Sequence, residues 1–168
     1  TGRALDMDVY GNDPFLSVEH ALQLSRAVHV VNLDQLLACA DIVSLHVPLM
    51  DATRGMVNAD YLARMKDGAV LLNFSRGELV DSDAVLAALK SGKLRRYVTD
   101  FPTDDMLCTE GVIALPHLGA STPESEDNCA EMAARQIVDY LTRGAIVNSV
   151  NYPACDPGTT AGPRLCVL

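Results

Sequence analysis

The chain has 168 residues, 49% of them apolar, and a formal net charge of −9. This length and composition are enough for one ordinary domain with a sizeable core. A chain this acidic repels phosphate backbones and anionic membrane surfaces, so we expect neither nucleic acid nor a membrane as a partner. The five cysteines are widely spaced and form no C-x-x-C pair, which argues against a disulfide framework or a metal site and is typical of a reducing cytoplasm.

Short apolar stretches alternate with amphipathic ones along the chain. The apolar stretches predict strands at residues 7–11, 29–31, 42–47, 69–74, 94–99, 111–115 and 145–150. The amphipathic stretches predict helices at residues 17–26, 33–40, 58–66, 81–92 and 121–143. This alternation predicts a doubly wound parallel sheet of the Rossmann-like α/β class, with right-handed crossovers and helices on both faces.

Local residues mark where several of these helices begin and end. Asn58 and Asp81 are predicted N-caps, and Gly92 is predicted to end the helix that Asp81 begins. A Ser-x-x-Glu capping box from Ser121 to Glu124 predicts the start of the long helix.

Polar residues lie at or just beyond the carboxyl ends of five of the predicted strands: Asp13, His46, Arg76, Asp100 and His117. The carboxyl ends of the strands in an open α/β sheet line its ligand-binding crevice, so we expect these residues to share a site. Arg76 is the leading candidate because it follows a continuous apolar run, which is typical of a strand buried on both faces.

Asp13 bears on the choice of cofactor. In dinucleotide-binding sheets, an acidic residue at the end of the second strand bonds the adenosine ribose hydroxyls. No Lys or Arg follows Asp13 within ten residues to neutralise a 2′-phosphate, so we predict NAD rather than NADP. The alternative is a turn aspartate that precedes Pro14.

Three stretches resemble the motifs of the D-2-hydroxyacid dehydrogenase family: HVPLMDATRGMVN at 46–58, NFSRGELVD at 73–81 and LPHLGAST at 115–122. They occur in the family's order and at about its spacing, and the resemblance covers Met7 to Tyr152. Within the family, HLGASTPESEDNCAEMAARQIVDYL and IVNSVNYP are similar to the phosphoglycerate-oxidising members.

The resemblance implies catalytic roles for three residues. Arg76 would bind the substrate carboxylate, since its planar fork matches a carboxylate in two bonds. His117 would take and return the proton of the C2 hydroxyl. The family's glutamate beside the histidine aligns with Asp104 if one residue is deleted and with Asp105 otherwise, and Glu110 is another substitute. An acidic surface loop without a catalytic role is the alternative.

The resemblance also implies a set of cofactor-binding residues. Asp100 would contact the nicotinamide carboxamide, whereas His46 has no role in proton transfer and is expected to be structural. The expected NAD contacts are Asp13, Val47, Pro48, Thr53, Phe74, Ser75, Asp100, His117, Gly119 and Ala120.

The same likeness implies a domain organisation. We expect residues 1–121 to be the NAD-binding domain without its first strand and G-x-G-x-x-G loop. Residues 122–152 would cross toward the substrate domain, and residues 153–168 would be a linker and the first strand of a regulatory ACT domain. We therefore expect a fragment of a longer chain that is inactive alone, and measurable turnover by the 168 residues would contradict this.

The implied function is NAD-dependent oxidation of 3-phosphoglycerate to 3-phosphohydroxypyruvate, the first step of serine biosynthesis, by a cytoplasmic homodimer or homotetramer. A sibling enzyme acting on another small 2-hydroxy acid, such as those that give hydroxypyruvate or glyoxylate, or on lactate, is an alternative. A non-catalytic relative that senses NAD as a corepressor and a degraded gene product are two others.

Overall fold

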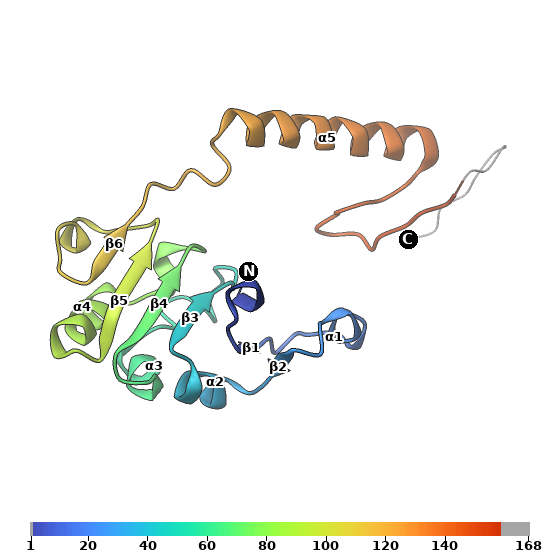
Figure 1. The fold of residues 1–168 in the computed structure, drawn as a ribbon. Coiled ribbons are helices and arrows are strands. Elements are labelled where there is room, and N and C mark those ends of the chain that lie inside the picture. Colours follow the sequence, from blue (N-terminus) through green and yellow to red (C-terminus); the bar gives the residue numbers. More distant parts are fainter. Residues whose placement is uncertain (1, 159–168) are drawn as a thin grey trace. The chain divides into compact units, whose positions relative to one another are not determined.

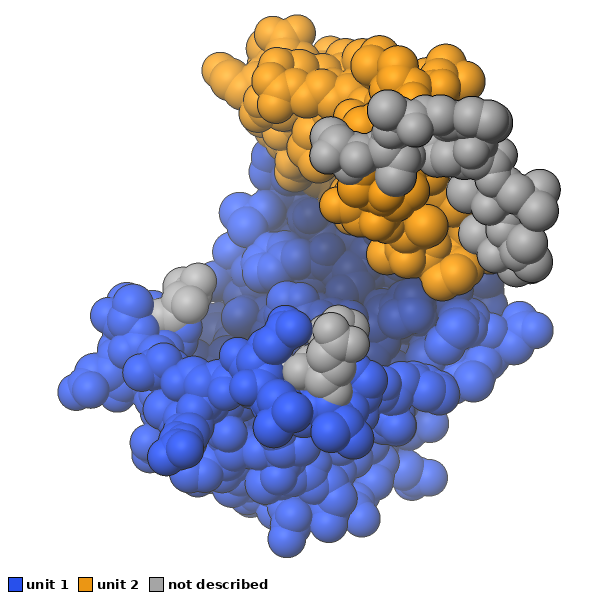
Figure 2. Space-filling view, turned by 90° about the vertical axis from the view of Figure 1, so that its right-hand side faces the viewer, with its two compact units in different colours: residues 1–116 blue, residues 117–168 orange. Residues whose placement is uncertain are grey.

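The structure is a computed structural model that describes residues 2–158 of the chain. The chain forms two compact units, Thr1–Pro116 and His117–Leu168, which are coloured separately in Figure 2. The predicted first strand of an ACT domain and the end of the predicted linker lie outside the described residues.

The first unit contains two parallel sheets. The smaller sheet pairs β1 (Val9–Gly11) with β2 (Val28–Val30). The larger sheet has the order β3-β4-β5-β6, from β3 (Ile42–Leu45), β4 (Ala69–Asn73), β5 (Leu94–Thr99) and β6 (Val112–Ala114) (Figure 1). All six strands lie within the predicted ranges or one residue outside them, and the parallel α/β prediction is confirmed.

Helices connect these strands. The α-helices of the first unit are α1 (Val18–Gln23), α2 (Leu33–Cys39), α3 (Ala59–Arg64) and α4 (Ser82–Ser91). Short 3-10 turns are η1 (Gly2–Leu5), η2 (Gly77–Leu79) and η3 (Asp104–Met106). Parallel strands cannot be joined by a tight turn, so they need long crossover connections, usually with a helix.

The core lies on one face of the four-stranded sheet. Leu71 of β4 and Tyr97 of β5 are paired in register and are 0% and 1% exposed. The same cluster contains at least one buried residue from each covering helix, for example Leu37 of α2, Leu62 of α3 and Val85 of α4. Burial of this apolar surface, at about 25 cal/mol per Å², stabilises the first unit.

The predicted caps of α3 and α4 are confirmed. The side chain of Asn58 accepts a hydrogen bond from the backbone N–H of Tyr61, and Asp81 accepts one from Ala84. Gly92 ends α4 at φ 78°, a left-handed conformation that glycine adopts at little cost. Each N-cap satisfies a backbone N–H that has no partner within its helix.

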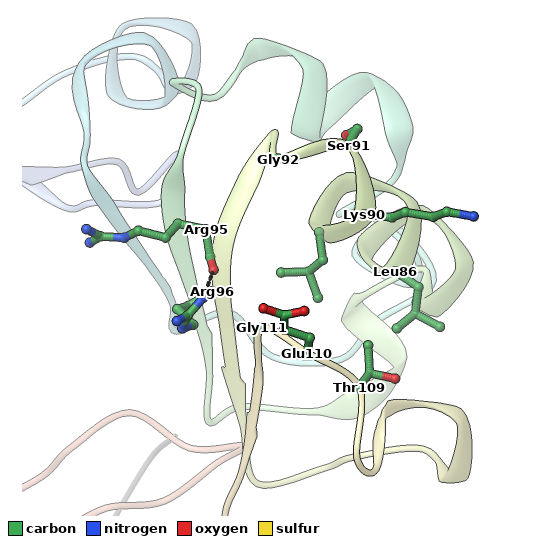
Figure 3. A pocket seen from close by; sticks show the side chains of 10 residues that line it. Leu86, Lys90, Ser91, Gly92, Arg95, Arg96, Thr109, Glu110 and Gly111 are labelled. Atoms are coloured by element: carbon green, nitrogen blue, oxygen red, sulfur yellow. Dashed lines mark hydrogen bonds between the residues drawn. The ribbon is translucent and has the colours of Figure 1, made fainter.

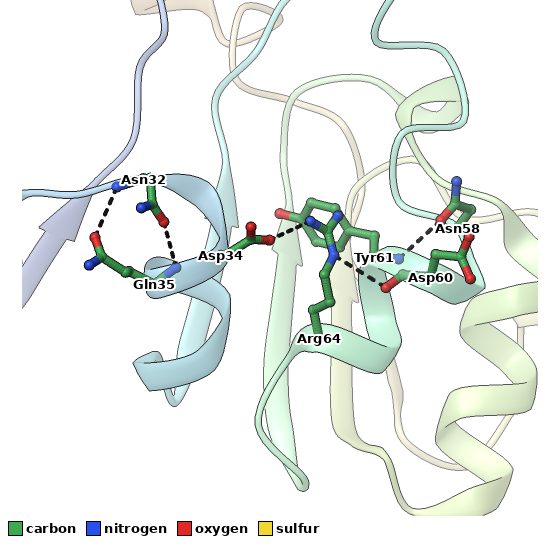
Figure 4. Close-up of polar contacts among 7 residues, drawn as sticks. All are labelled: Asn32, Asp34, Gln35, Asn58, Asp60, Tyr61 and Arg64. Carbon is green, nitrogen blue, oxygen red and sulfur yellow. Dashed lines mark hydrogen bonds and ion pairs between the residues drawn. The ribbon is translucent and has the colours of Figure 1, made fainter.

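An ion pair joins α2 to α3 (Figure 4). Arg64 Nη1 lies 2.6 Å from Asp34 Oδ1, and the guanidinium lies over the ring of Tyr61 at 5.7 Å. Burial raises the pKa of the Tyr61 hydroxyl above its ordinary value, and the charge of Arg64 partly opposes that rise. Asn32 and Gln35 form a reciprocal capping box at the start of α2.

The second unit contains α5 (Pro123–Arg143). Its N-cap is Thr122, which accepts a hydrogen bond from the Ser125 N–H, so the prediction of a cap at Ser121 was wrong by one residue. The reason is Pro123, which lacks an N–H and therefore suits the first helical position, so that its predecessor becomes the cap.

The strand predicted at 145–150 was also wrong. Within residues 2–158, this segment forms only one isolated antiparallel bridge, between Ile146 and Cys155. Asn148 adopts φ 56°, which breaks the extended backbone after one pair has formed. Among the described residues, no helix combines the length and the apolar composition that crossing a membrane requires.

Candidate active site at the carboxyl edge of the sheet

The strand register aligns the carboxyl ends of the four-stranded sheet. Asn73 of β4 pairs with Leu45 of β3 on one side and with Thr99 of β5 on the other. The predicted residues His46, Arg76 and Asp100 follow these three strands. The structure therefore brings three of the predicted strand-end residues to one edge of the first unit.

The loop that carries Arg76 is fastened by the last residue of β4. Asn73 is fully buried. Its Nδ2 donates a hydrogen bond of 2.9 Å to the carbonyl oxygen of Arg76, and its Oδ1 accepts one of 3.1 Å from the Ser75 N–H. A single amide side chain thus fixes the backbone on both sides of the turn.

Two further bonds hold this loop. The Ser75 hydroxyl donates to the carbonyl oxygen of Leu45 at 2.7 Å, which ties the loop to β3. The Tyr97 hydroxyl lies 3.4 Å from Asn73 Nδ2.

Arg76 is exposed, and its Nη1 donates to the Ser75 carbonyl at 2.7 Å. The guanidinium has five N–H donors, so most of them remain for a ligand.

The loops after β4 and β5 touch at Gly77. A Cβ atom at this position would lie 3.2 Å from Cβ of Phe101, which is tighter than ordinary contact, so the close approach favours glycine. Thr99 fixes the second loop, because its Oγ1 accepts a hydrogen bond of 3.0 Å from the Phe101 N–H. Arg76 and the half-buried Asp100 therefore stand on two packed loops.

The loop after β3 is ordered by Thr53. Its hydroxyl lies 2.7 Å from the carbonyl oxygen of Pro48 and accepts a hydrogen bond of 2.8 Å from the Met50 N–H. His46, which precedes this loop, has its Nε2 atom 2.9 Å from the hydroxyl of Ser44. These bonds fix the side chains of Thr53 and His46, while Val47 and Pro48 form the start of the loop.

Asp13 lies in the turn after β1, and its side chain is exposed. Its Oδ1 accepts a hydrogen bond of 2.9 Å from the Phe15 N–H, as expected of a turn aspartate before proline. The second carboxylate oxygen can still accept from ribose hydroxyls, so the turn role and cofactor binding are compatible.

The acidic residues predicted to partner His117 lie at different edges of the sheet. Asp104 begins η3, and Asp104 and Asp105 are both exposed in the first unit. Glu110 precedes β6 and therefore lies at the amino edge, opposite Arg76, which disfavours it as a substitute. His117, Gly119 and Ala120 are exposed in the second unit. Their pairing with Arg76 stays a prediction.

A hollow of about 730 Å³ lies at the amino edge of the sheet (Figure 3). The end of α4 and the loop before β6 line it, with Leu86, Glu110 and Gly111 among the lining residues. The charged ends of Lys90 and Arg95 point away from the hollow in Figure 3. Glu110 lines the hollow, but none of the expected NAD contacts does, nor do Arg76 and Asp104. Among residues 2–158, no three His, Cys, Asp or Glu side chains are placed to hold a metal ion.

The fold and the polar carboxyl edge define an NAD-binding domain of the Rossmann-like class. The family model of the D-isomer specific 2-hydroxyacid dehydrogenase NAD-binding domain matches residues 1–119. The chain therefore belongs to the D-isomer specific 2-hydroxyacid dehydrogenase family.

Curated relatives agree with this assignment. The chain is 38% identical to D-3-phosphoglycerate dehydrogenase of Haemophilus influenzae, over 89% of this chain and 38% of the relative. It is 35% identical to the Escherichia coli (strain K12) protein of the same name, over 96% of this chain and 41% of the relative. The chain thus spans about two fifths of the length of these relatives.

Solved structures of related enzymes share the fold. Apo D-mandelate dehydrogenase of Rhodotorula graminis superposes with a TM-score of 0.77 at 25% identity, covering 91% of this chain and 46% of that one. The NAD-complexed D-isomer specific 2-hydroxyacid dehydrogenase of Lactobacillus delbrueckii ssp. bulgaricus gives 0.74 at 26% identity, covering 88% and 49%.

Sequence reasoning missed two contributors to this edge. The Tyr97 hydroxyl and the Thr99 hydroxyl both come from β5, and neither stood out because each lies inside a strand pattern. Asn73 was part of a motif but had no assigned role. An Asn that ends an apolar run is the signal for such a turn, because Asn side chains bond the backbone two residues further on.

Proposed function

We propose that this chain is part of an enzyme that oxidises D-3-phosphoglycerate to 3-phosphohydroxypyruvate with NAD. The observation that carries the proposal is the fixed position of Arg76 at the carboxyl edge of the sheet. The names of the curated relatives support the choice of substrate.

In the proposed reaction, Arg76 bonds the substrate carboxylate through its planar fork and so orients the C2 carbon. The imidazole of His117 accepts the proton of the C2 hydroxyl as the C2–H bond breaks and the C2–O bond becomes double. Bound NAD supplies the acceptor for the hydride. An acidic partner of His117, for which we propose Asp104, favours the protonated imidazole.

The proposed cofactor contacts lie along the same edge. Asp13 would bond the adenosine ribose, and its negative charge would repel the 2′-phosphate of NADP. Asp100 would bond the nicotinamide carboxamide. The further contacts proposed are Val47, Pro48, Thr53, Phe74, Ser75, His117, Gly119 and Ala120.

The sheet order supports a further proposal about the phosphate loop. A dinucleotide-binding sheet has the strand order 3-2-1-4-5-6, with the glycine-rich turn after strand 1. Here β2-β1 corresponds to the flank 3-2, and β3-β4-β5 corresponds to the flank 4-5-6, which β6 extends by one strand. We therefore propose that one more parallel strand belongs between β1 and β3 and carries the pyrophosphate loop.

Other features remain proposals on the basis of family likeness. These are a homodimer or homotetramer, a role in serine biosynthesis in the cytoplasm, a crossover segment at 122–152 and an ACT domain after the linker.

The test is an assay of the full-length protein, meaning the whole natural polypeptide that carries these residues. NADH formation at 340 nm would be followed with D-3-phosphoglycerate, D-glycerate, D-lactate and D-mandelate. We expect the highest kcat/KM with D-3-phosphoglycerate. A preference for another of these acids would support the second candidate, a sibling dehydrogenase, which the D-mandelate dehydrogenase likeness favours.

A protein that binds NAD but oxidises none of these acids would contradict both proposals. That outcome would support the corepressor-like alternative instead.

A further inference from the structure

We propose that Asn73 is a positioning residue, which acts on the substrate through Arg76 and has no contact with the substrate itself. The inference rests on the proposed function, because it assigns to Arg76 the binding of the substrate carboxylate. It concerns the carboxamide of a residue that lies at the end of β4.

Asn73 is buried although its side chain is polar. Asn73 and Thr99 are the two fully buried polar residues among the described part of the chain, and both are 0% exposed. Burying an amide costs free energy unless its polar atoms find hydrogen-bond partners. The partners of Asn73 are all in the Arg76 loop or on the neighbouring strand.

Asn73 and Thr99 have matched geometry at the ends of their strands. Asn73 and Thr99 face each other in register across β4 and β5. Each accepts a hydrogen bond from the backbone N–H two residues further on, Ser75 in one case and Phe101 in the other. Two neighbouring strands therefore end in side-chain-fixed turns at the same edge, one before Arg76 and one around Asp100.

Of these two side chains, only that of Asn73 bonds Arg76. Its Nδ2 donates to the Arg76 carbonyl oxygen, while the Tyr97 hydroxyl lies within reach of the same nitrogen. The two nitrogen-bound hydrogens can serve these two acceptors, which fixes the amide plane. The Arg76 backbone is then held in place, and only its side chain needs to order when a carboxylate binds.

The test is a double-mutant cycle in the full-length protein with Asn73→Ala, Arg76→Ala and the double variant. A displacement of about 1 Å in a substrate-binding group costs on the order of 100-fold in rate. We expect Asn73→Ala to raise KM for the 2-hydroxy acid by about 10-fold or more and to raise the Kd for NAD by a smaller factor. In the Arg76→Ala background, Asn73→Ala should have almost no further effect.

Asn58→Ala is the matched control, because Asn58 makes the same kind of bond to a backbone N–H in the cap of α3, outside the site. It should leave KM unchanged. Tyr97→Phe is a milder second variant in case Asn73→Ala does not fold, since it removes only the hydroxyl beside the amide. We expect a smaller rise in KM, of about two- to threefold.

The outcomes separate the two proposals. Suppose that the parent protein oxidises the acid. The positioning role is then overturned if the two single losses are additive, or if KM is unchanged in both Asn73→Ala and Tyr97→Phe. In either case the proposed function stands. If the parent protein oxidises no 2-hydroxy acid, the proposed function fails and the positioning role fails with it.

Discussion

The two edges of the four-stranded sheet differ in a way that bears on function. At the carboxyl edge, buried Asn73 and Thr99 bond the backbone beyond their strands and fix the loops that carry the site residues. The amino edge has a hollow of about 730 Å³, but the charged ends of Lys90 and Arg95 point away from it. A ligand site depends on oriented polar groups, so we propose the better-fixed carboxyl edge as the functional one.

The largest expected effect comes from removing the cation at the carboxyl edge. Arg76→Ala in the full-length protein should lower kcat/KM for D-3-phosphoglycerate by about 10²- to 10³-fold, because the substrate carboxylate loses a charged partner. Steady-state assays of NADH formation measure this. Glu110→Gln, at the amino edge, is the control and should stay within about twofold of the parent. Equal losses in the two variants would remove the distinction between the edges.

The cofactor preference should depend on Asp13. Asp13→Ser keeps an oxygen that can accept from the Phe15 N–H but removes the negative charge. We expect the ratio of kcat/KM with NADP to that with NAD to rise by about 10-fold or more, because like charges at close range cost several kcal/mol. Asp8→Ser, an exposed aspartate before β1, should leave the ratio unchanged. An unchanged ratio in Asp13→Ser would show that the ribose end lies elsewhere.

Removing the N-cap of α3 tests whether the protein can lose stability and keep its catalytic activity. Asn58→Ala should lower the free energy of unfolding by about 1 kcal/mol, because the Tyr61 N–H loses its partner. Urea denaturation followed by circular dichroism measures this, with kcat/KM unchanged. A loss of activity without a loss of stability would place Asn58 in the site.

Buried Tyr61 should make the folded protein slightly less stable at alkaline pH. Burial raises its pKa above the ordinary value of 10.0, so the folded state favours the neutral phenol. This contribution is fully present below pH 10 and is lost as the pH rises further. Melting temperatures between about pH 8 and about pH 10.5 should therefore fall less in Tyr61→Phe than in the parent. Equal falls would show that the ionisation of Tyr61 does not oppose folding.

Much of the carboxyl edge could be predicted from the sequence. The apolar run before Asn73 identified β4, and parallel strands place the residues at their carboxyl ends along one edge, so Arg76 and Asp100 were found together. The contacts between loops could not be predicted. The bond from Ser75 to Leu45 and the approach of Gly77 to Phe101 join residues far apart in the chain.

The errors in the second unit have a different cause. The apolar residues at 145–150 have strand propensity, but a strand also needs a partner, and only Ile146 pairs within the described part of the chain. The capping error arose because Ser121 and Thr122 are both good caps, and the geometry of Pro123 decides between them.

Hydrogen–deuterium exchange of the full-length protein, with and without NAD, tests most directly whether the carboxyl edge is the cofactor site. Binding should slow exchange of the backbone amides at 46–53, 73–77 and 100–104, which lie at the carboxyl edge. Residues 86–92 and 109–111, around the amino-edge hollow, should exchange at the same rate in both states. Protection of the amino-edge residues, with none at the carboxyl edge, would contradict this account.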